Sequence, residues 1–234
     1  TFGEPSNTSE TLLNGSDLAV LTLQSGVTDR LPFMLYDGSV IGDLGRFVGY
    51  GLRGTGSAGS VAGPAGQARR VAETVIDWYG VAKNCGVAQP FCDRAGTTDI
   101  LSADFDDGTS GSNRLAGSIV GSAAFMTTYE GTTAPGDSGG PLLVLRDDAW
   151  LIAGVTSGGS SPNSVYGDIA WWTGVGSPEA RAFVEAWDGV YWSFEEEPAP
   201  DPLEDPAAVP APPAAALLLG ALAALAAGRR PRRG

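Results

Sequence analysis

The most specific motif in the chain is Gly136-Asp137-Ser138-Gly139-Gly140-Pro141, which leads at once into the apolar run Leu142-Leu143-Val144-Leu145. A serine becomes a useful nucleophile where its hydroxyl is exposed and where backbone N–H groups point at the developing oxyanion. Glycines on both sides allow the turns with positive φ that bring two such N–H groups together. The stretch therefore predicts a nucleophilic loop around Ser138 that leads directly into a β-strand.

Two other structures are compatible with a serine between glycines. In a nucleophile elbow the serine lies between a strand and a long helix, but here Pro141 and a β-type run follow. A plain glycine-rich loop is the second alternative, and the full six-residue run before a strand argues against it. We therefore expect an all-β protein and not an α/β-hydrolase.

The remainder of residues 12–174 alternates short apolar stretches with turn residues, which is typical of an antiparallel barrel or sandwich. Strands are predicted at residues 16–23, 142–145, 150–156 and 165–170, with the middle two joined as a hairpin by residues 146–148. The Gly/Ser/Ala-rich run 51–66 is predicted to be a mobile surface loop.

A late helix is predicted from Ser177 to about Asp188. Ser177 supplies an N-cap, and Pro178 suits the first turn. Spacing places Ala182, Phe183, Ala186 and Trp187 on one face, which we expect to pack against the sheet.

Four segments resemble the trypsin/chymotrypsin family of serine proteases. Residues 16–21 resemble the strand that carries the triad aspartate, and residues 47–51 resemble the segment that opens the second barrel. Residues 136–141 match the nucleophile motif in full, and residues 154–159 with 165–166 resemble the segments beside the specificity pocket. The resemblance covers roughly residues 12–190 and implies a chymotrypsin-like double antiparallel β-barrel with a C-terminal helix.

The resemblance also implies a role for each matching residue. Ser138 would attack the scissile carbonyl, and the N–H groups of Gly136 and Ser138 would form the oxyanion hole. Asp17 would orient the triad imidazole, and Ser157 would hydrogen-bond this aspartate. Asp137 would receive the α-ammonium group formed when a zymogen is cut.

The specificity pocket implied by the resemblance has Thr132 at its floor, with Gly159 and Ser164 at its walls. Thr132 is not a carboxylate, so a strong preference for Arg or Lys lacks its usual counter-charge. We expect a protein or peptide substrate with a small or medium uncharged side chain at this position, and no cofactor.

The chain departs from the family because it contains no histidine. One explanation is that residues 1–194 are a protease domain without its N-terminal part, which we favour because Ser138 and its glycines are intact. The other is a catalytically silent pseudoprotease that acts as a surface binding module. In either case the 234-residue chain alone is expected to be inactive, because the triad's cooperative contribution is lost without its base.

Charge and cysteines restrict the other function classes. The formal net charge is −13, which argues against nucleic acid because phosphate binding needs a basic face.

Cys85 and Cys92 are predicted to form a local disulfide, which would place the protein outside the reducing cytosol. Two thiols without histidine leave a zinc shell incomplete. Residues 104–108 are acidic, and a turn is favoured there over a calcium site.

The last forty residues differ in character from the rest of the chain. Residues 195–208 are acidic and rich in proline, which predicts an extended linker. Residues 211–228 are apolar and would span about 27 Å as a helix, against a hydrocarbon core of about 30 Å. The arginines at 229–233 would stay on the cytoplasmic side.

Residues 209–233 resemble the PEP-CTERM class of bacterial sorting signals in its Val-Pro-x-Pro variant, although Ala211 stands where the more usual motif has Glu. The resemblance implies export to the cell surface or medium, anchoring through residues 211–228, and a membrane sorting enzyme as partner. We expect the exported protein to be a monomer.

Overall fold

The computed structural model describes residues 15–61, 68–80, 100–116 and 127–191. The chain divides into two units, Thr1–Trp192 and Ser193–Gly234, and all described residues belong to the first. The predicted Cys85–Cys92 disulfide, the linker 195–208 and the segment 209–234 lie outside the described residues. Within them, no helix is long and apolar enough to cross a membrane.

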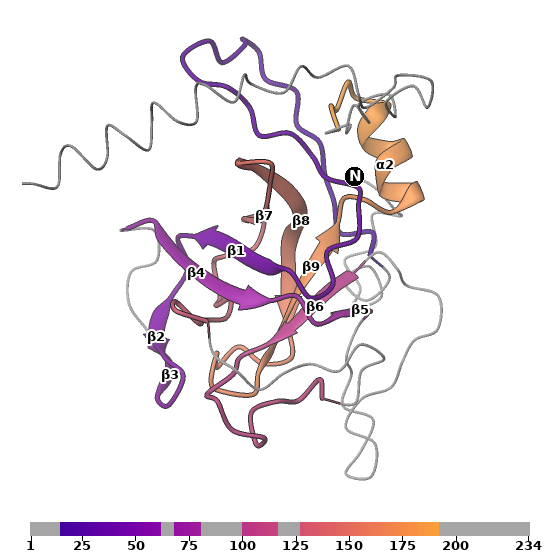
Figure 1. Cartoon of the computed structure of the whole chain (residues 1–234). Helices are drawn as coiled ribbons and strands as arrows, with labels where there is room; N and C mark the ends of the chain where they lie inside the picture. The colour runs from indigo at the N-terminus through magenta and orange to yellow at the C-terminus, as the bar shows by residue number, and fades with distance from the viewer. Residues whose placement is uncertain (1–14, 62–67, 81–99, 117–126, 192–234) are drawn as a thin grey trace, which may run out of the picture. The chain divides into compact units, whose positions relative to one another are not determined.

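Nine strands and one short helix account for the regular structure of the described residues (Figure 1). The strands are β1 Leu44–Gly49, β2 Arg53–Thr55, β3 Gly59–Val61, β4 Arg70–Val75, β5 Trp78–Tyr79, β6 Ile100–Asp104, β7 Pro141–Arg146, β8 Ala149–Gly159 and β9 Ile169–Gly174. The helix is α2, Pro178–Glu185. Seven strands form one antiparallel sheet in the order β4-β1-β7-β8-β9-β6-β5, and β2 pairs with β3. The prediction of a β-protein is confirmed.

The seven-stranded sheet curls until its two edges approach each other. Strands β4 and β5 lie at opposite ends of the sheet order, yet only Ile76 and Asp77 separate them in sequence. The N–H of Asp77 donates to the Ser102 carbonyl at 3.0 Å, and the Thr74 hydroxyl donates to the Asp104 carbonyl at 3.4 Å. A short connection between opposite edges requires a curled sheet, and its interior holds the core.

The core is built from the inward side chains of the central strands. Leu142 and Val144 are fully buried in β7, Trp172 is fully buried in β9, and Leu145 is exposed. The rings of Phe47 and Trp172 lie 5.6 Å apart. Burying a side chain of the size of Leu142 stabilises the fold by about 2 kcal/mol. The strand that follows Ser138 therefore anchors the Ser138 loop to the core.

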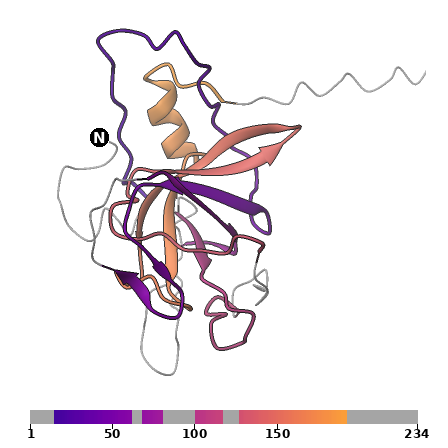
Figure 2. The same cartoon turned by 90° about the vertical axis from the view of Figure 1, so that its left-hand side faces the viewer.

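The predicted hairpin between β7 and β8 is confirmed. Asp147 and Asp148 both have positive φ, 46° and 62°, as a two-residue turn of type I′ requires. Arg146 belongs to the strand and not to the turn. The hairpin projects well beyond the rest of the sheet (Figure 2).

Three predicted segments differ from the structure. Residues 165–168 form a turn, and β9 begins only at Ile169, because the Asp168 carboxylate accepts the Val165 N–H at 2.9 Å and Gly167 has φ +83°. Part of the run 51–66, predicted to be a loop, forms the β2–β3 hairpin. Residues 16–23 form none of the named strands, and Leu21 and Leu23 are 85% and 63% exposed.

Helix α2 begins as predicted but packs through a different face. The Ser177 hydroxyl accepts the Ala180 N–H at 3.1 Å. Ala180 and Val184 are buried against Leu18 and β8, with Phe183 partly buried beside them. Trp187 is 56% exposed, so the face predicted from Ala182, Ala186 and Trp187 is wrong.

Candidate active site

Ser138 lies exposed on a tight loop that two glycines shape. Gly136 and Gly139 have φ values of +97° and +82°, conformations that a residue with a Cβ adopts only with strain. The Gly139 N–H donates to the Thr156 carbonyl at 2.8 Å, and the Thr156 N–H donates to the Gly140 carbonyl at 2.8 Å. This pair of bonds ties the loop to β8 immediately after Ser138.

The predicted donors of the oxyanion hole are the N–H groups of Gly136 and Ser138. No hydrogen bond among the described residues uses either of them, whereas the neighbouring N–H groups of Asp137 and Gly139 are both engaged. The Ser138 hydroxyl likewise has no partner in the described part of the chain. The loop is thus held by its neighbours, while both predicted donors and the Ser138 hydroxyl have no hydrogen-bond partner among the described residues.

The Asp137 carboxylate braces the loop from behind. One oxygen accepts the Gly51 N–H at 2.7 Å, and the other accepts the Ala134 N–H at 2.9 Å. A Cβ on Gly49 would lie 1.9 Å from this carboxylate, and one on Gly51 would lie 2.7 Å from it. The family resemblance implied only that Asp137 receives an incoming ammonium group. This bracing was not predicted, although the Gly-x-Gly pattern at 49–51 leaves room for it.

Asp17 and Ser157 are brought together as predicted. The Ser157 hydroxyl donates to the Asp17 carboxylate at 2.8 Å. The pairing of β8 with β9 shifts register between Thr156 and Gly158, so Ser157 stands outside the regular ladder. A bulge of this kind re-aims a side chain, and here the side chain points to Asp17.

A continuous path connects Ser138 to Asp17. Gly139, next to Ser138, bonds Thr156 of β8, and Ser157, next to Thr156, bonds Asp17. The two residues predicted as catalytic therefore attach to the same short segment of one strand. Asp17 is exposed, which leaves its second oxygen accessible to a further group.

A cavity of about 280 Å³ opens beside Ser138, and Thr132 and Gly159 line it. Ser164 lies outside this cavity; it is buried, donates its hydroxyl to the Thr133 carbonyl at 3.0 Å, and lines a neighbouring cavity of about 400 Å³. Asp168 also lines the cavity beside Ser138. Asp168 was not predicted as a site residue, because residues 165–170 were expected to form a strand and not the turn before β9.

Comparison with known proteins adds no relative. No protein-family model matches the chain, and no curated protein matches it either. Any function therefore rests on the residues themselves and their arrangement.

Proposed function

We propose that this chain is the larger, C-terminal part of a trypsin-like serine endopeptidase that cleaves peptide bonds through an acyl-enzyme on Ser138. The observation that carries the proposal is the path from Ser138 through β8 to the bond between Ser157 and Asp17. A loop that merely turned the chain would not need an exposed hydroxyl beside a cavity, two open N–H donors and a carboxylate tethered to the same strand.

In the proposed reaction the Ser138 oxygen attacks the carbonyl carbon of the substrate. A histidine from outside this chain, placed in space between the side chains of Asp17 and Ser138, takes the serine proton and passes it to the leaving amine. The N–H groups of Gly136 and Ser138 stabilise the oxyanion, and Asp17 accepts a hydrogen bond from the imidazolium and stabilises its charge. Water then attacks the acyl-enzyme by the same steps and releases the acid.

The chain contains no histidine, so the general base must come from outside these 234 residues. We propose that the curled sheet is the second barrel of a chymotrypsin-like double barrel and that residues 15–35 belong to the first. Leu21, Leu31 and Phe33 are 85%, 92% and 55% exposed, which is expected of barrel residues whose partners are missing.

Asp168 changes the expected substrate preference of the proposed protease. It is the charged residue among those lining the cavity beside Ser138. A carboxylate at such a site favours a cationic side chain. The test is the rate of cleavage of peptides that differ only in the substrate side chain that enters this cavity. It compares Lys and Arg with the small or medium uncharged residues predicted from Thr132.

The proposal also includes the location inferred from the sequence. We propose an exported, monomeric protein held at the bacterial surface through residues 211–228 until a membrane sorting enzyme acts on it. Immunodetection of the native protein in membrane and medium fractions, with and without residues 209–234, tests this point.

The experiment for the catalytic proposal compares the activity of two proteins. One is the chain alone, and the other is the chain extended by any residues that its gene encodes before Thr1. We expect the chain alone to be inactive, and the extended form to hydrolyse peptides and to react with a fluorophosphonate at Ser138. Ser138→Ala in the extended form is the matched control and should abolish both signals.

The absence of histidine favours one second candidate, a silent protease-like module that binds peptides. If the extended form also lacks a histidine and turns over no peptide, yet binds peptides in the cavity beside Ser138, the module is the correct function and the catalytic proposal fails.

A further inference from the structure

One wall of the cavity beside Ser138 is formed by the loop between β8 and β9. We call residues 160–168 the wall loop. Its residues Ser161, Pro162 and Asp168 line the cavity. The position of this loop therefore helps to decide which side chains the cavity accepts.

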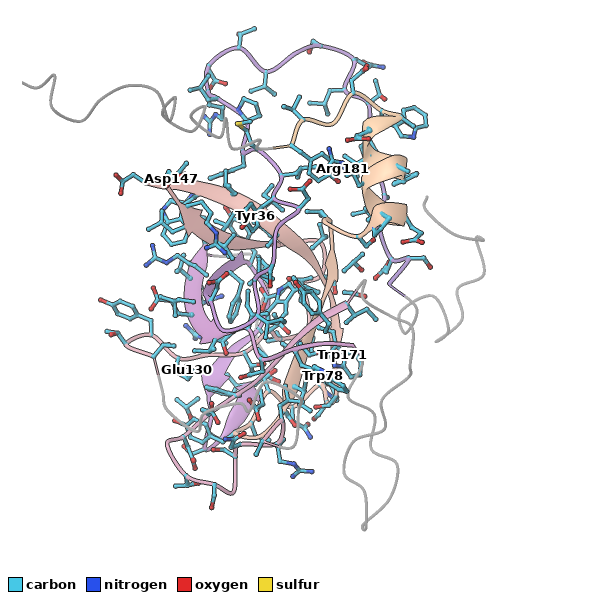
Figure 3. The ribbon with its side chains drawn as sticks, turned by 45° about the vertical axis from the view of Figure 1, so that its right-hand side comes forward. Tyr36, Trp78, Glu130, Asp147, Trp171 and Arg181 are labelled. Carbon is cyan, nitrogen blue, oxygen red and sulfur yellow. The ribbon has the colours of Figure 1, made fainter. Side chains whose placement is uncertain are left out.

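The base of the wall loop is anchored in the sheet. The Ser160 N–H donates to the Ile169 carbonyl at 2.8 Å, and Ile169 is buried with Trp78 and Leu115. Trp171 packs against the same cluster, and Figure 3 shows Trp78 and Trp171 close together. These contacts fix the base of the loop, and other contacts hold its middle.

The β2–β3 hairpin holds the middle of the wall loop. The Ser60 N–H donates to the Asn163 carbonyl at 2.5 Å, and the Ser60 hydroxyl donates to the Pro162 carbonyl at 2.9 Å. The Tyr166 N–H donates to the Gly56 carbonyl at 2.9 Å. The hairpin is thus hydrogen-bonded to the loop at both ends of its turn.

Two glycines let the hairpin approach the loop closely. Gly59 has φ +78°, and a Cβ there would lie 2.7 Å from the Asn163 carbonyl oxygen. A Cβ on Gly56 would lie 2.4 Å from the ring of Tyr166, and this ring packs on Phe105 with 4.7 Å between the ring centroids. A larger residue at either glycine would therefore push the hairpin and the loop apart.

The wall loop depends on these bonds because it borders two cavities. It lines the cavity of about 280 Å³ beside Ser138 and, through Ser164 and Tyr166, the neighbouring cavity of about 400 Å³. Close packing holds side chains in place inside a protein, and a loop that borders open space has less of it. The hairpin bonds, together with the bond from the Ser164 hydroxyl to the Thr133 carbonyl, therefore set the position of the loop.

The position of Asp168 follows from that of the wall loop. Its Oδ2 atom accepts the Val165 N–H at 2.9 Å, and its own N–H donates to the Val165 carbonyl at 2.9 Å. Val165 directly precedes Tyr166, which the hairpin holds. The Asp168 Oδ1 atom accepts no hydrogen bond from the described residues, so it can accept one from a ligand in the cavity.

We propose that the β2–β3 hairpin determines the specificity of the cavity beside Ser138. Gly56, Gly59 and Ser60 act as positioning residues that hold the wall loop. The loop in turn presents Asp168 to a cationic side chain of the ligand. The inference rests on the proposed function only in taking that side chain as part of a peptide substrate, and the preference of the cavity can be measured without catalysis.

The test is the binding of two small probes to the 234-residue chain, measured by isothermal titration calorimetry. Phenylguanidinium is a cation, and phenylurea has the same shape without the charge. We expect the parent to bind phenylguanidinium at least about tenfold more tightly than phenylurea, because a hydrogen bond between charged partners is stronger. Asp168→Asn should remove most of this preference.

Gly59→Ala tests the role of the hairpin, because its Cβ would meet the Asn163 carbonyl oxygen. We expect it to lower the preference for phenylguanidinium at least about threefold, because a hydrogen bond weakens steeply when its angle changes. Gly42→Ala is the matched control: Gly42 has φ +88°, but a Cβ there would meet nothing within 4 Å. Gly42→Ala therefore introduces similar backbone strain without the clash, and it should keep the preference of the parent.

Two further variants keep the test decisive if Gly59→Ala does not fold. Ser60→Ala removes the hydroxyl bond to Pro162 and should lower the preference in the same direction. Gly56→Ala should lower it as well, and adding Tyr166→Ala should restore part of it, because the ring that the new Cβ meets is gone. A hairpin that only stabilised the fold would show no such rescue.

The proposal is overturned if the parent shows no preference for phenylguanidinium, or if Gly42→Ala lowers the preference as much as Gly59→Ala does. It is also overturned if the folded hairpin variants keep the preference of the parent. If the extended form cleaves no peptide while these binding results hold, the catalytic proposal fails and the role of the hairpin stands.

Discussion

Replacing Gly49 by alanine tests the brace behind Ser138. The new Cβ would lie 1.9 Å from the Asp137 carboxylate, which two N–H groups hold at 2.7 and 2.9 Å. The carboxylate must move and lose at least one charge-assisted hydrogen bond, worth about 1.5–3 kcal/mol. With crowding against β1, we expect Gly49→Ala to lower the free energy of unfolding by about 3 kcal/mol.

Urea unfolding measures this loss, and thermal unfolding should show a fall of about 6–12 °C. Gly26→Ala is the matched control, because its Cβ would meet nothing within 4 Å, and it should change stability by less than about 0.5 kcal/mol. In an Asp137→Ala background, Gly49→Ala should lose most of its effect, since the clashing atoms are gone. Equal effects of Gly49→Ala in both backgrounds would refute the brace.

Two further changes test the packing that positions the site. Leu142→Ala should destabilise the fold by about 2–5 kcal/mol because Leu142 is fully buried. In the same urea unfolding experiment, Leu21→Ala, at a side chain that is 85% exposed, should be nearly neutral. Ser177→Ala removes the N-cap bond to Ala180 and should lower the unfolding free energy by about 1 kcal/mol, while Ser57→Ala on the exposed β2–β3 turn should not; equal effects would show that the cap contributes nothing.

The sequence predicted the parts of the site that depend on short-range rules. The glycines around Ser138 require positive φ, and the apolar run after Pro141 requires a buried strand, so both features follow from a few neighbouring residues. The contact of Asp17 with Ser157 joins residues 140 positions apart. It was expected only through the family resemblance, since no local pattern specifies such a partner.

Other features could not be predicted because they depend on tertiary contacts. The buried face of α2 is set by its contact with Leu18, a residue far away in the chain. Ala180 and Val184 are buried in this contact, and the larger Trp187 is not. The turn that delays β9 depends on the Asp168 carboxylate reaching Val165. In the acidic run 104–107, Asp104 and Asp106 are buried, whereas Asp107 bonds Thr109 and Ser112 within its own turn. The sequence alone does not distinguish these carboxylates.

The tie between Gly51 and Asp137 has a consequence for the order of folding. These residues are 86 positions apart, and β1 must already lie beside β7 for the bond to form. Contacts of such long range form slowly, because the entropy of closing a long loop is lost before any contact compensates for it. The loop of Ser138 should therefore be among the last parts of the chain to become ordered, and its conformation would report that folding is complete.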